Sequence, residues 1–430
     1  YAARIYKKYG PTSIEVVQNN PYLLAQDISG VGFKTADAIA FKLGFQHDSD
    51  VRAQAGIIYT LKEFMDDGHC YCPEEDLFSR CVEKLNLPRE VVLRATPDLE
   101  EEGLIVREKL GSDSAESLVF LKSLHDSEVS FAFRLDNFLK AGSTPINIDV
   151  EAALEWVQKH SAVKFSSQQQ EAIRKALSHR ALILTGGPGT GKTTIVRSIL
   201  DILERKKLRI GLAAPTGRAA KRLSEATGRP AQTIHRLLKF DPRQMTFEFD
   251  ASNPLPFDLL ILDESSMVDL PLMEQLFRAV HAQARVIWVG DVDQLPSVGP
   301  GQVLADLIES GRIEVVRLTD IFRQEGEGWI VENAHRVKQG LDPEFPENAQ
   351  DAFFIKREEP AEGAEIIREI VTNRIPQSFN VNPKTDIQVL TPMHRGELGS
   401  TYLNELLQSA LNSGGECVQQ YGRTFHRGDK

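Results

Sequence analysis

A glycine-rich segment at 186–194 reads Gly-Gly-Pro-Gly-Thr-Gly-Lys-Thr-Thr, with an apolar run at 181–185 before it and a helical pattern after it. Glycines allow main-chain N–H groups to converge on an anion, and a helix start adds positive potential. The segment fits G-x-x-x-x-G-K-[ST], in which Lys192 reaches the β and γ phosphates of a nucleotide and the Thr193 hydroxyl binds Mg2+. We predict that ATP contacts Gly187, Pro188, Gly189, Thr190, Gly191, Lys192, Thr193 and Thr194. The alternative is a plain glycine-rich turn, which the flanking strand and helix patterns disfavour.

Two acidic residues, Asp263 and Glu264, follow the apolar run 259–262 directly. Acidic pairs are common on surfaces, but a pair at the end of a buried strand, downstream of a phosphate loop, favours catalysis. We predict that Asp263 holds Mg2+ and that Glu264 orients or deprotonates the attacking water.

Two later polar residues complete the predicted catalytic set. Gln294 follows the apolar run 286–289, and its amide is placed to sense a γ-phosphate. Arg323 is a candidate arginine finger that would stabilise the transferred charge. The alternatives are a polar loop for Gln294 and a surface ion pair for Arg323.

The elements that must position these residues alternate between helix and strand from about residue 147 onward. Short apolar runs between helical stretches predict strands of a parallel sheet that is buried on both faces. The fold class expected is therefore α/β. The predicted strands are 181–185, 209–214, 259–262, 286–289 and 387–390.

The first 145 residues have a different character. Residues 1–46 predict short helices, and Gly30 and Gly32 form a Gly-Val-Gly turn that resembles a helix-hairpin-helix, whose amides bind a DNA phosphate. Residues 47–145 predict two helices at 74–85 and 88–102, then a hairpin with its turn at 111–113, which together resemble a winged helix. The first region carries a net charge of +2 and the second −9. The acidic balance favours a structural or protein-docking role for 47–145 over DNA recognition.

Composition limits the partners. The 430 residues carry a net charge of −11, so any nucleic acid must be bound by local cationic or main-chain donors rather than by the overall field. The spacing of the four cysteines does not fit a zinc site, and so few cysteines suit reduced thiols in the cytoplasm. We expect no membrane span, because no apolar window is long enough. The chain starts without Met and stops after a strand-like stretch, so we expect a fragment.

Three motifs together resemble one family. They are Gly-Pro-Gly-Thr-Gly-Lys-Thr at 187–193, Asp-Glu-Ser-Ser-Met at 263–267 and Gly-Asp-Val-Asp-Gln-Leu-Pro-Ser-Val-Gly-Pro-Gly at 290–301. They resemble the RecD-like DNA helicases of superfamily 1, the family of the exodeoxyribonuclease V alpha subunit and its stand-alone relatives, over about 145–430. The resemblance implies two P-loop RecA-like motor domains that sandwich ATP and Mg2+, and 5′ to 3′ movement on single-stranded DNA in repair or recombination. It also implies binding to DNA junctions.

The resemblance assigns further residues. Gln169 would read adenine, with Gln168 and Gln170 left open as alternatives of register. The segment 240–250 would form a small hairpin that splits the duplex, with its tip near 243–245, against an equal alternative of a decorative loop. The residues that would contact DNA in the motor domains are Thr216, Arg218, His235, Thr391 and His394.

These expectations divide the chain into a helix-hairpin-helix region at 1–46, a winged-helix-like domain and linker at 47–145, a first motor domain at 146–320 and an incomplete second one at 321–430. The family's later motifs would lie beyond Lys430. Two rival interpretations stay open. One is another P-loop motor on nucleic acid, such as an RNA helicase or the helicase half of a conjugative relaxase. The other is a module that binds DNA or, through 47–145, a protein partner, without turnover.

Overall fold

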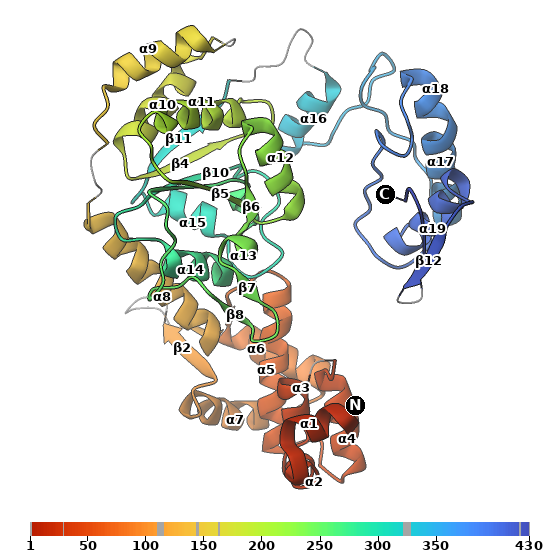
Figure 1. Cartoon of the computed structure of the whole chain (residues 1–430). Helices are drawn as coiled ribbons and strands as arrows, with labels where there is room; N and C mark the ends of the chain where they lie inside the picture. The colour runs from red at the N-terminus through yellow and green to blue at the C-terminus, as the bar shows by residue number, and fades with distance from the viewer. Residues whose placement is uncertain are drawn as a thin grey trace. The chain divides into compact units, whose positions relative to one another are not determined.

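The computed structural model describes residues 2–28, 30–109, 116–142, 146–161, 164–320, 328–420 and 423–429. The chain divides into two compact units, residues 1–324 and 325–430. In the first unit, an N-terminal module (residues 2–121) precedes a sheet domain (residues 122–320), and Figure 1 shows both. Among the described helices, none combines the length and the apolar character that crossing a membrane requires.

Six parallel strands form the centre of the sheet domain, in the order β11-β4-β10-β9-β5-β6. Their bounds are β4 Ala181–Gly186, β5 Ile210–Ala214, β6 Gln232–Thr233, β9 Leu259–Leu262, β10 Arg285–Gly290 and β11 Glu314–Leu318. The runs predicted at 181–185, 209–214, 259–262 and 286–289 thus form β4, β5, β9 and β10. The α/β class with a parallel sheet is confirmed, and the strands are continuously apolar because both faces are buried.

Helices cover both faces of this sheet. One face packs against α9, α10 and α11, and the other against α8, α13, α14 and α15. Successive residues of a strand point to opposite faces of the sheet. Leu182 and Leu184 therefore pack against α9, α10 and α11, and Ile183 packs in the core on the opposite face. The bounds are α8 Lys122–Lys140, α9 Val150–His160, α10 Ser167–Ser178, α11 Lys192–Glu204, α12 Gly217–Thr227, α13 Ile234–Leu237, α14 Leu270–Ala279 and α15 Val303–Glu309, with the short strands β7 Phe240–Asp241 and β8 Thr246–Phe247 and a 3-10 turn at Ser265–Met267.

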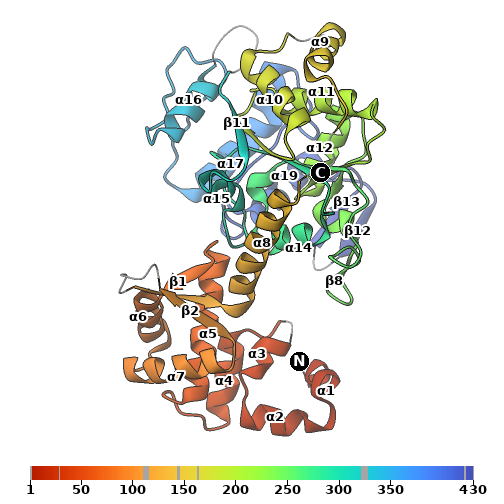
Figure 2. The same ribbon diagram turned by 90° about the vertical axis from the view of Figure 1, so that its left-hand side faces the viewer.

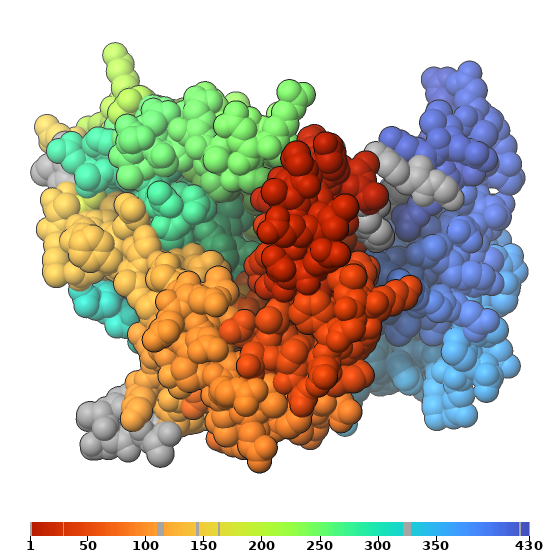
Figure 3. All heavy atoms as spheres, turned by 90° about the horizontal axis from the view of Figure 1, so that it is seen from below, coloured from red at the N-terminus to blue at the C-terminus, as the bar shows by residue number. Residues whose placement is uncertain are grey.

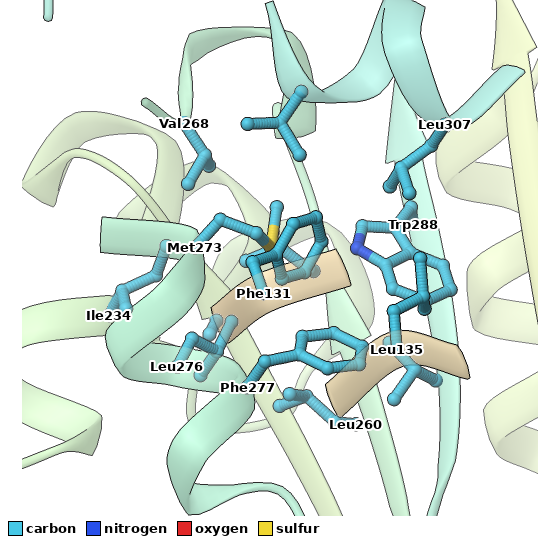
Figure 4. Packing of buried hydrophobic residues seen from close by; sticks show 14 of the residues in the cluster. Phe131, Leu135, Ile234, Leu260, Val268, Met273, Leu276, Phe277, Trp288 and Leu307 are labelled. Carbon is cyan, nitrogen blue, oxygen red and sulfur yellow. The ribbon is translucent and has the colours of Figure 1, made fainter. Parts of the chain in front are cut away.

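Helix α8 belongs to the core of the sheet domain, although the predicted boundary at 145 assigns it to the preceding domain and linker. It leaves the N-terminal module and runs along α14, as Figure 2 shows. Its Phe131 ring meets the Phe277 ring edge-on at 5.2 Å, and Phe277 stacks on Trp288 of β10 at 5.6 Å. Figure 4 shows this packing. The boundary predicted at 145 did not include α8 in the sheet domain because the contacts of α8 are with residues far along the chain. Residues 143–145 of the predicted linker lie outside the described part.

We expect Phe131→Ala to lower the free energy of unfolding by about 3 kcal/mol, because it removes a buried ring from the core. Phe133→Ala is the matched control on the same helix, since its ring is 68% exposed. We expect that control to stay within about 0.5 kcal/mol of the parent protein. Denaturant titration of both variants measures the difference, and equal losses would show that α8 is not part of this core.

The N-terminal module shares one core across the predicted boundary at 46. Tyr22 and Phe33 from the first part pack with Ile57, Leu99 and Val119 from the second. The order α5-β1-α6-α7-β2-β3, with β3 between β1 and β2, is winged-helix-like. The predicted hairpin is β2 and β3, while its turn at 111–113 lies outside the described residues. The bounds are α1 Ala2–Tyr9, α2 Ser13–Asn19, α3 Leu23–Asp27, α4 Phe33–Lys42, α5 Asp50–Asp66, α6 Glu74–Leu85, α7 Arg89–Glu101, β1 Tyr71–Pro73, β2 Ile105–Lys109 and β3 Ser117–Leu121, with a 3-10 turn at Gly10–Thr12.

The second unit contains helices and one antiparallel strand pair in its described residues, not a parallel sheet. The strand predicted at 387–390 is wrong, because this segment is irregular and Leu390 is 87% exposed. An apolar run becomes a strand only where neighbouring strands accept its main-chain hydrogen bonds, and β12 and β13 pair with each other instead. The bounds are α16 Trp329–Lys338, α17 Pro360–Glu369, a π-helical turn Ile370–Arg374, α18 Ile375–Phe379, α19 Ser400–Leu411, β12 Cys417–Gln420 and β13 Arg423–His426.

Candidate nucleotide-binding site

The predicted phosphate loop joins the end of β4 to the start of α11. Gly191 caps that helix with a φ of +85°, a conformation that favours glycine. A side chain there would also collide with Gln169, whose Nε2 would lie 2.4 Å from the added Cβ. The loop is held by a bond from the Thr190 hydroxyl to the carbonyl of Gly187 at 2.9 Å. The glycines therefore shape a tight turn with main-chain amides at a helix start, which suits an anion.

Lys192 lies in the first turn of α11 and folds back over the loop. Its ammonium donates to the carbonyl oxygens of Gly186 at 2.5 Å and Gly187 at 3.0 Å. Three protons on one flexible ammonium allow exchange of these acceptors for phosphate oxygens without movement of the main chain.

Asp263 and Glu264 follow β9, two strands away from β4 in the sheet. The amide of Asp263 donates to the carbonyl of Ala213 at 2.9 Å, and its carboxylate accepts from the amide of Glu264 at 3.0 Å. Burial raises the pKa of Asp263 to about 6, and the charge of Lys192 opposes that rise. Glu264 has a φ of +50°, an uncommon conformation for a non-glycine residue that re-aims its side chain as the strand ends.

A divalent cation fits these donors. A neighbouring positive charge would stabilise the ionised form of the buried Asp263 carboxylate. This carboxylate and the exposed Thr193 hydroxyl are oxygen ligands of the kind that Mg2+ prefers. The described residues contain no cluster of three or more His, Cys, Asp or Glu arranged for a metal, so a bound Mg2+ would take its other ligands from phosphate oxygens and water.

Gln294 lies in the loop after β10, the strand between β4 and β9. Its side-chain amide donates to the carboxylate of Asp291 at 3.1 Å, and its main-chain amide donates to the carbonyl of the same residue at 3.2 Å. Asp291 is 2% exposed. The amide of Val292 donates to the Thr185 hydroxyl at 3.3 Å. The sequence analysis missed Asp291 as the residue that orients Gln294, although its place at a strand end was a signal.

Gln169 lies beneath the phosphate loop. It is 2% exposed, its Nε2 donates to the carbonyl of Thr190 at 3.1 Å, and its Oε1 accepts from the amide of Ser166 at 3.2 Å. The amide therefore links the N-cap of α10 to the phosphate loop, and adenine reading by Gln169 stays a prediction. The alternatives bond elsewhere, since Gln168 donates to the Thr319 hydroxyl at 2.8 Å and Gln170 to the carbonyl of Phe165 at 3.1 Å.

The other predicted residues lie outside this cluster. Arg323 lies outside the described residues. Gly30 and Gly32 precede α4 in the N-terminal module, and Gly32 is the N-cap of that helix. Two residues lie in the second unit, where the Thr391 hydroxyl donates to the carbonyl of Leu398 at 2.5 Å and the His394 ring lies 3.1 Å from the Ser400 hydroxyl.

Thr216 and His235 follow β5 and β6, on the same edge of the sheet as the phosphate loop. The Thr216 hydroxyl oxygen accepts from the amide of Ala219 at 3.2 Å, which caps α12 and leaves the hydroxyl proton free to donate. Arg218 is exposed in the first turn of that helix. Because the strands are parallel, one edge of the sheet carries Lys192, Asp263, Glu264 and Gln294 and, farther along, these three residues.

Comparison with known proteins agrees with these motifs. The profile of the "ATP-dependent RecD2 DNA helicase HHH domain" matches residues 1–71, and that of an "AAA domain" matches 169–300. The chain is 32% identical to the ATP-dependent RecD2 DNA helicase of Deinococcus radiodurans over 421 residues, which is 96% of this chain and 56% of that protein. It is 45% identical to the RecBCD enzyme subunit RecD of Mycolicibacterium smegmatis over 168 residues, 33% of this chain and 30% of that protein.

A solved structure, the Pif1 helicase of Candida albicans, matches 50% of this chain and 55% of that chain at 20% identity with a TM-score of 0.34, which is too low to carry an argument. This chain spans about half the length of the Deinococcus relative. The chain is thus similar to RecD-like helicases from its first residues through the phosphate loop and beyond.

Proposed function

We propose that this protein is an ATP-dependent DNA helicase or translocase. The observation that supports this most is the convergence of Lys192, Asp263, Glu264 and Gln294 on the ends of the neighbouring strands β4, β9 and β10. Such a cluster provides a phosphate anchor, a cation ligand, a proton acceptor and a polar sensor. The related RecD2 protein carries the same activity in its name.

In the proposed reaction, Lys192 exchanges its loop carbonyls for the β and γ phosphates of ATP. Asp263 and Thr193 would hold Mg2+, which would supply positive charge for the developing phosphate charge. Glu264 accepts a proton from the attacking water, and Gln294, held by Asp291, donates its amide toward the γ-phosphate side. Gln169 keeps the loop in place from below, and Arg323 supplies a further positive charge.

The proposed path for single-stranded DNA crosses the edge of the sheet beyond β5 and β6. Arg218, Arg222 and Arg236 are exposed there, and within the described part of the chain no carboxylate pairs with any of them. Unpaired cations of this kind bind phosphates without competition, which explains how an acidic protein could bind DNA. The Thr216 hydroxyl would add a neutral donor.

The hairpin β7–β8 is proposed as the wedge that separates the duplex. Its strands pair Phe240 with Phe247, and residues 242–245 form the tip, where Met245 is 72% exposed. The His235 ring lies 5.6 Å from the Phe240 ring and 6.0 Å from the Phe247 ring, between centroids. A DNA-facing residue thus packs directly on the base of the hairpin, which supports a mechanical role.

We expect the double variant Arg218→Ala/Arg222→Ala to weaken binding to single-stranded DNA at all sequences. The slope of log affinity against log salt should fall by about 0.7 for each lost phosphate contact. Arg209→Ala is the control, because Arg209 precedes the opposite end of β5 and is already paired with Asp258 at 2.8 Å. Fluorescence anisotropy at several salt concentrations measures both, and an unchanged slope in the double variant would remove these arginines from the DNA path.

A second DNA contact is proposed at the N-terminal module. Gly32 is the N-cap of α4 and is exposed, and the exposed Lys34 lies in the first turn. Beside the Gly30 turn, the three cations Arg4, Lys7 and Lys8 of α1 line a hollow together with Ile28 and one carboxylate, Asp27. A helix start among cations suits a phosphate of a DNA junction. The acidic helices α6 and α7 suit a protein partner instead.

The deciding experiment measures ATP hydrolysis and strand separation by the full-length protein. We expect single-stranded DNA to stimulate hydrolysis more than RNA does, and a 5′ single-stranded tail to support unwinding where a 3′ tail does not. DNA binding without turnover would contradict the proposal and favour a binding module, and stronger stimulation by RNA would favour another motor.

We also propose a cytoplasmic location, because all four cysteines are free thiols.

A further inference from the structure

The loop that carries Gln294, residues 291–301, is held by the sheet domain at both ends and, at its far end, by the N-terminal module as well. Its first residues are tied to the sheet domain through Asp291 and Thr185. At its other end, the amide of Gly301 donates to the carbonyl of Gly68 at 3.0 Å. Gly68 lies in the turn between α5 and β1 of the N-terminal module, so the module contacts the Gln294 loop directly. Figure 3 shows the module (red to orange) against the sheet domain (gold to green).

The contact around Gly301 is close. A Cβ added at Gly301 would lie 2.9 Å from Cβ of Leu270 and 3.2 Å from Sγ of Cys70, and the φ of Gly301 is +99°. Only glycine suits both the conformation and the space. Cys70 is partly buried and packs on the core of the sheet domain. Burial raises the pKa of its thiol to about 12, so this side chain acts as a neutral packing group.

The second half of this loop, residues 297–301, is internally bonded. The Ser297 hydroxyl is buried and lies 2.8 Å from the carbonyl oxygens of both Gly299 and Gly301. The carbonyl of Pro300 accepts from the amide of Leu270 at 2.9 Å. A shift at Gly301 is therefore passed on through these bonds as far as Ser297, three residues along the chain from Gln294.

We propose that the α5–β1 turn, residues 67–70, is a positioning element for ATP hydrolysis that holds the far end of the Gln294 loop. This inference rests on the proposed function. No residue of the turn needs to touch the nucleotide. Its effect arises because a polar group misplaced by about 1 Å loses much of its effect on the transition state. Nucleotide binding, which depends on the phosphate loop, should be untouched.

The test compares Gly68→Ala with Gly44→Ala. Both glycines are in the N-terminal module, with φ of +93° and +90°, and an added Cβ at either meets no atom within 4 Å. Both variants therefore carry the same main-chain strain, but only at Gly68 does the strain displace a carbonyl that is bonded to the sheet domain. We expect Gly68→Ala to lower kcat at saturating single-stranded DNA roughly five-fold with unchanged KM for ATP, the pattern of an interaction that acts in the transition state. Gly44→Ala should keep the parent kcat.

Hydrogen exchange supplies a readout that does not depend on activity. We expect the Gly301 amide to exchange faster in Gly68→Ala than in Gly44→Ala, because its acceptor has moved. Equal exchange and equal kcat in the two variants would overturn the inference and leave the helicase proposal standing. A parent protein without DNA-stimulated hydrolysis would overturn both.

Discussion

Lys192→Ala is expected to lower ATP hydrolysis by about 10³-fold while single-stranded DNA binding is retained. The ammonium of Lys192 lies over the phosphate loop, bonded to Gly186 and Gly187, and it is the residue of α11 that can neutralise the β and γ phosphates. The proposed DNA path beyond β5 and β6 does not include it. Loss of nucleotide charge compensation should therefore leave DNA affinity unchanged.

The control for this variant is Lys159→Ala. Lys159 is an exposed lysine of α9, 75% accessible and 3.9 Å from Glu155, and it belongs to none of the proposed sites. Steady-state hydrolysis and anisotropy with labelled DNA measure the two functions separately. If folded Lys192→Ala lost both functions to the same extent, the role assigned to Lys192 would be wrong.

Glu264→Gln is expected to lower hydrolysis by about 10² to 10⁴-fold and to leave ATP affinity intact, since general base catalysis contributes effects of this size. Glutamine keeps the length and shape of the side chain and can adopt the same uncommon φ of +50°, but it does not accept a proton from water. Asp263, which would hold Mg2+, is unchanged in the variant, so the nucleotide should still be bound with its cation.

Glu225→Gln provides the control, because Glu225 is an exposed residue of α12, 3.8 Å from Lys221, outside the catalytic cluster. Binding of a fluorescent ATP analogue and single-turnover hydrolysis are the two measurements. Normal hydrolysis by Glu264→Gln would assign the proton acceptor elsewhere. Weak ATP binding by a folded variant would instead make Glu264 a binding group.

Much of the catalytic cluster could be predicted because its signals are local. A strand end, a glycine-rich turn and a helix start are adjacent in the sequence, and parallel strands bring their carboxyl ends to one edge without further information. The predicted hairpin at 240–250 also depends on neighbouring residues, and it forms β7 and β8. The roles of these residues in catalysis and unwinding stay predictions.

Predictions that depended on distant partners were less successful. The run 387–390 has the composition of a buried strand but forms none, because a strand needs partners that its own residues do not specify. The sequence did not indicate that the two amide atoms of Gln169 bond to Ser166 and Thr190, and adenine reading by Gln169 stays a prediction. Asp291 was missed because its effect on Gln294 is a matter of side-chain direction.

The sequence by itself determined the resemblance to RecD-like helicases, the parallel α/β sheet and the set of polar residues that gather at one edge of that sheet, because short-range patterns encode all three. Only the tertiary structure decided that α8 completes the sheet-domain core and that Gly301 of the Gln294 loop bonds to Gly68 of the N-terminal module. Those contacts join residues far apart in the chain, and their energy comes from close packing and main-chain hydrogen bonds that appear only when the surfaces meet.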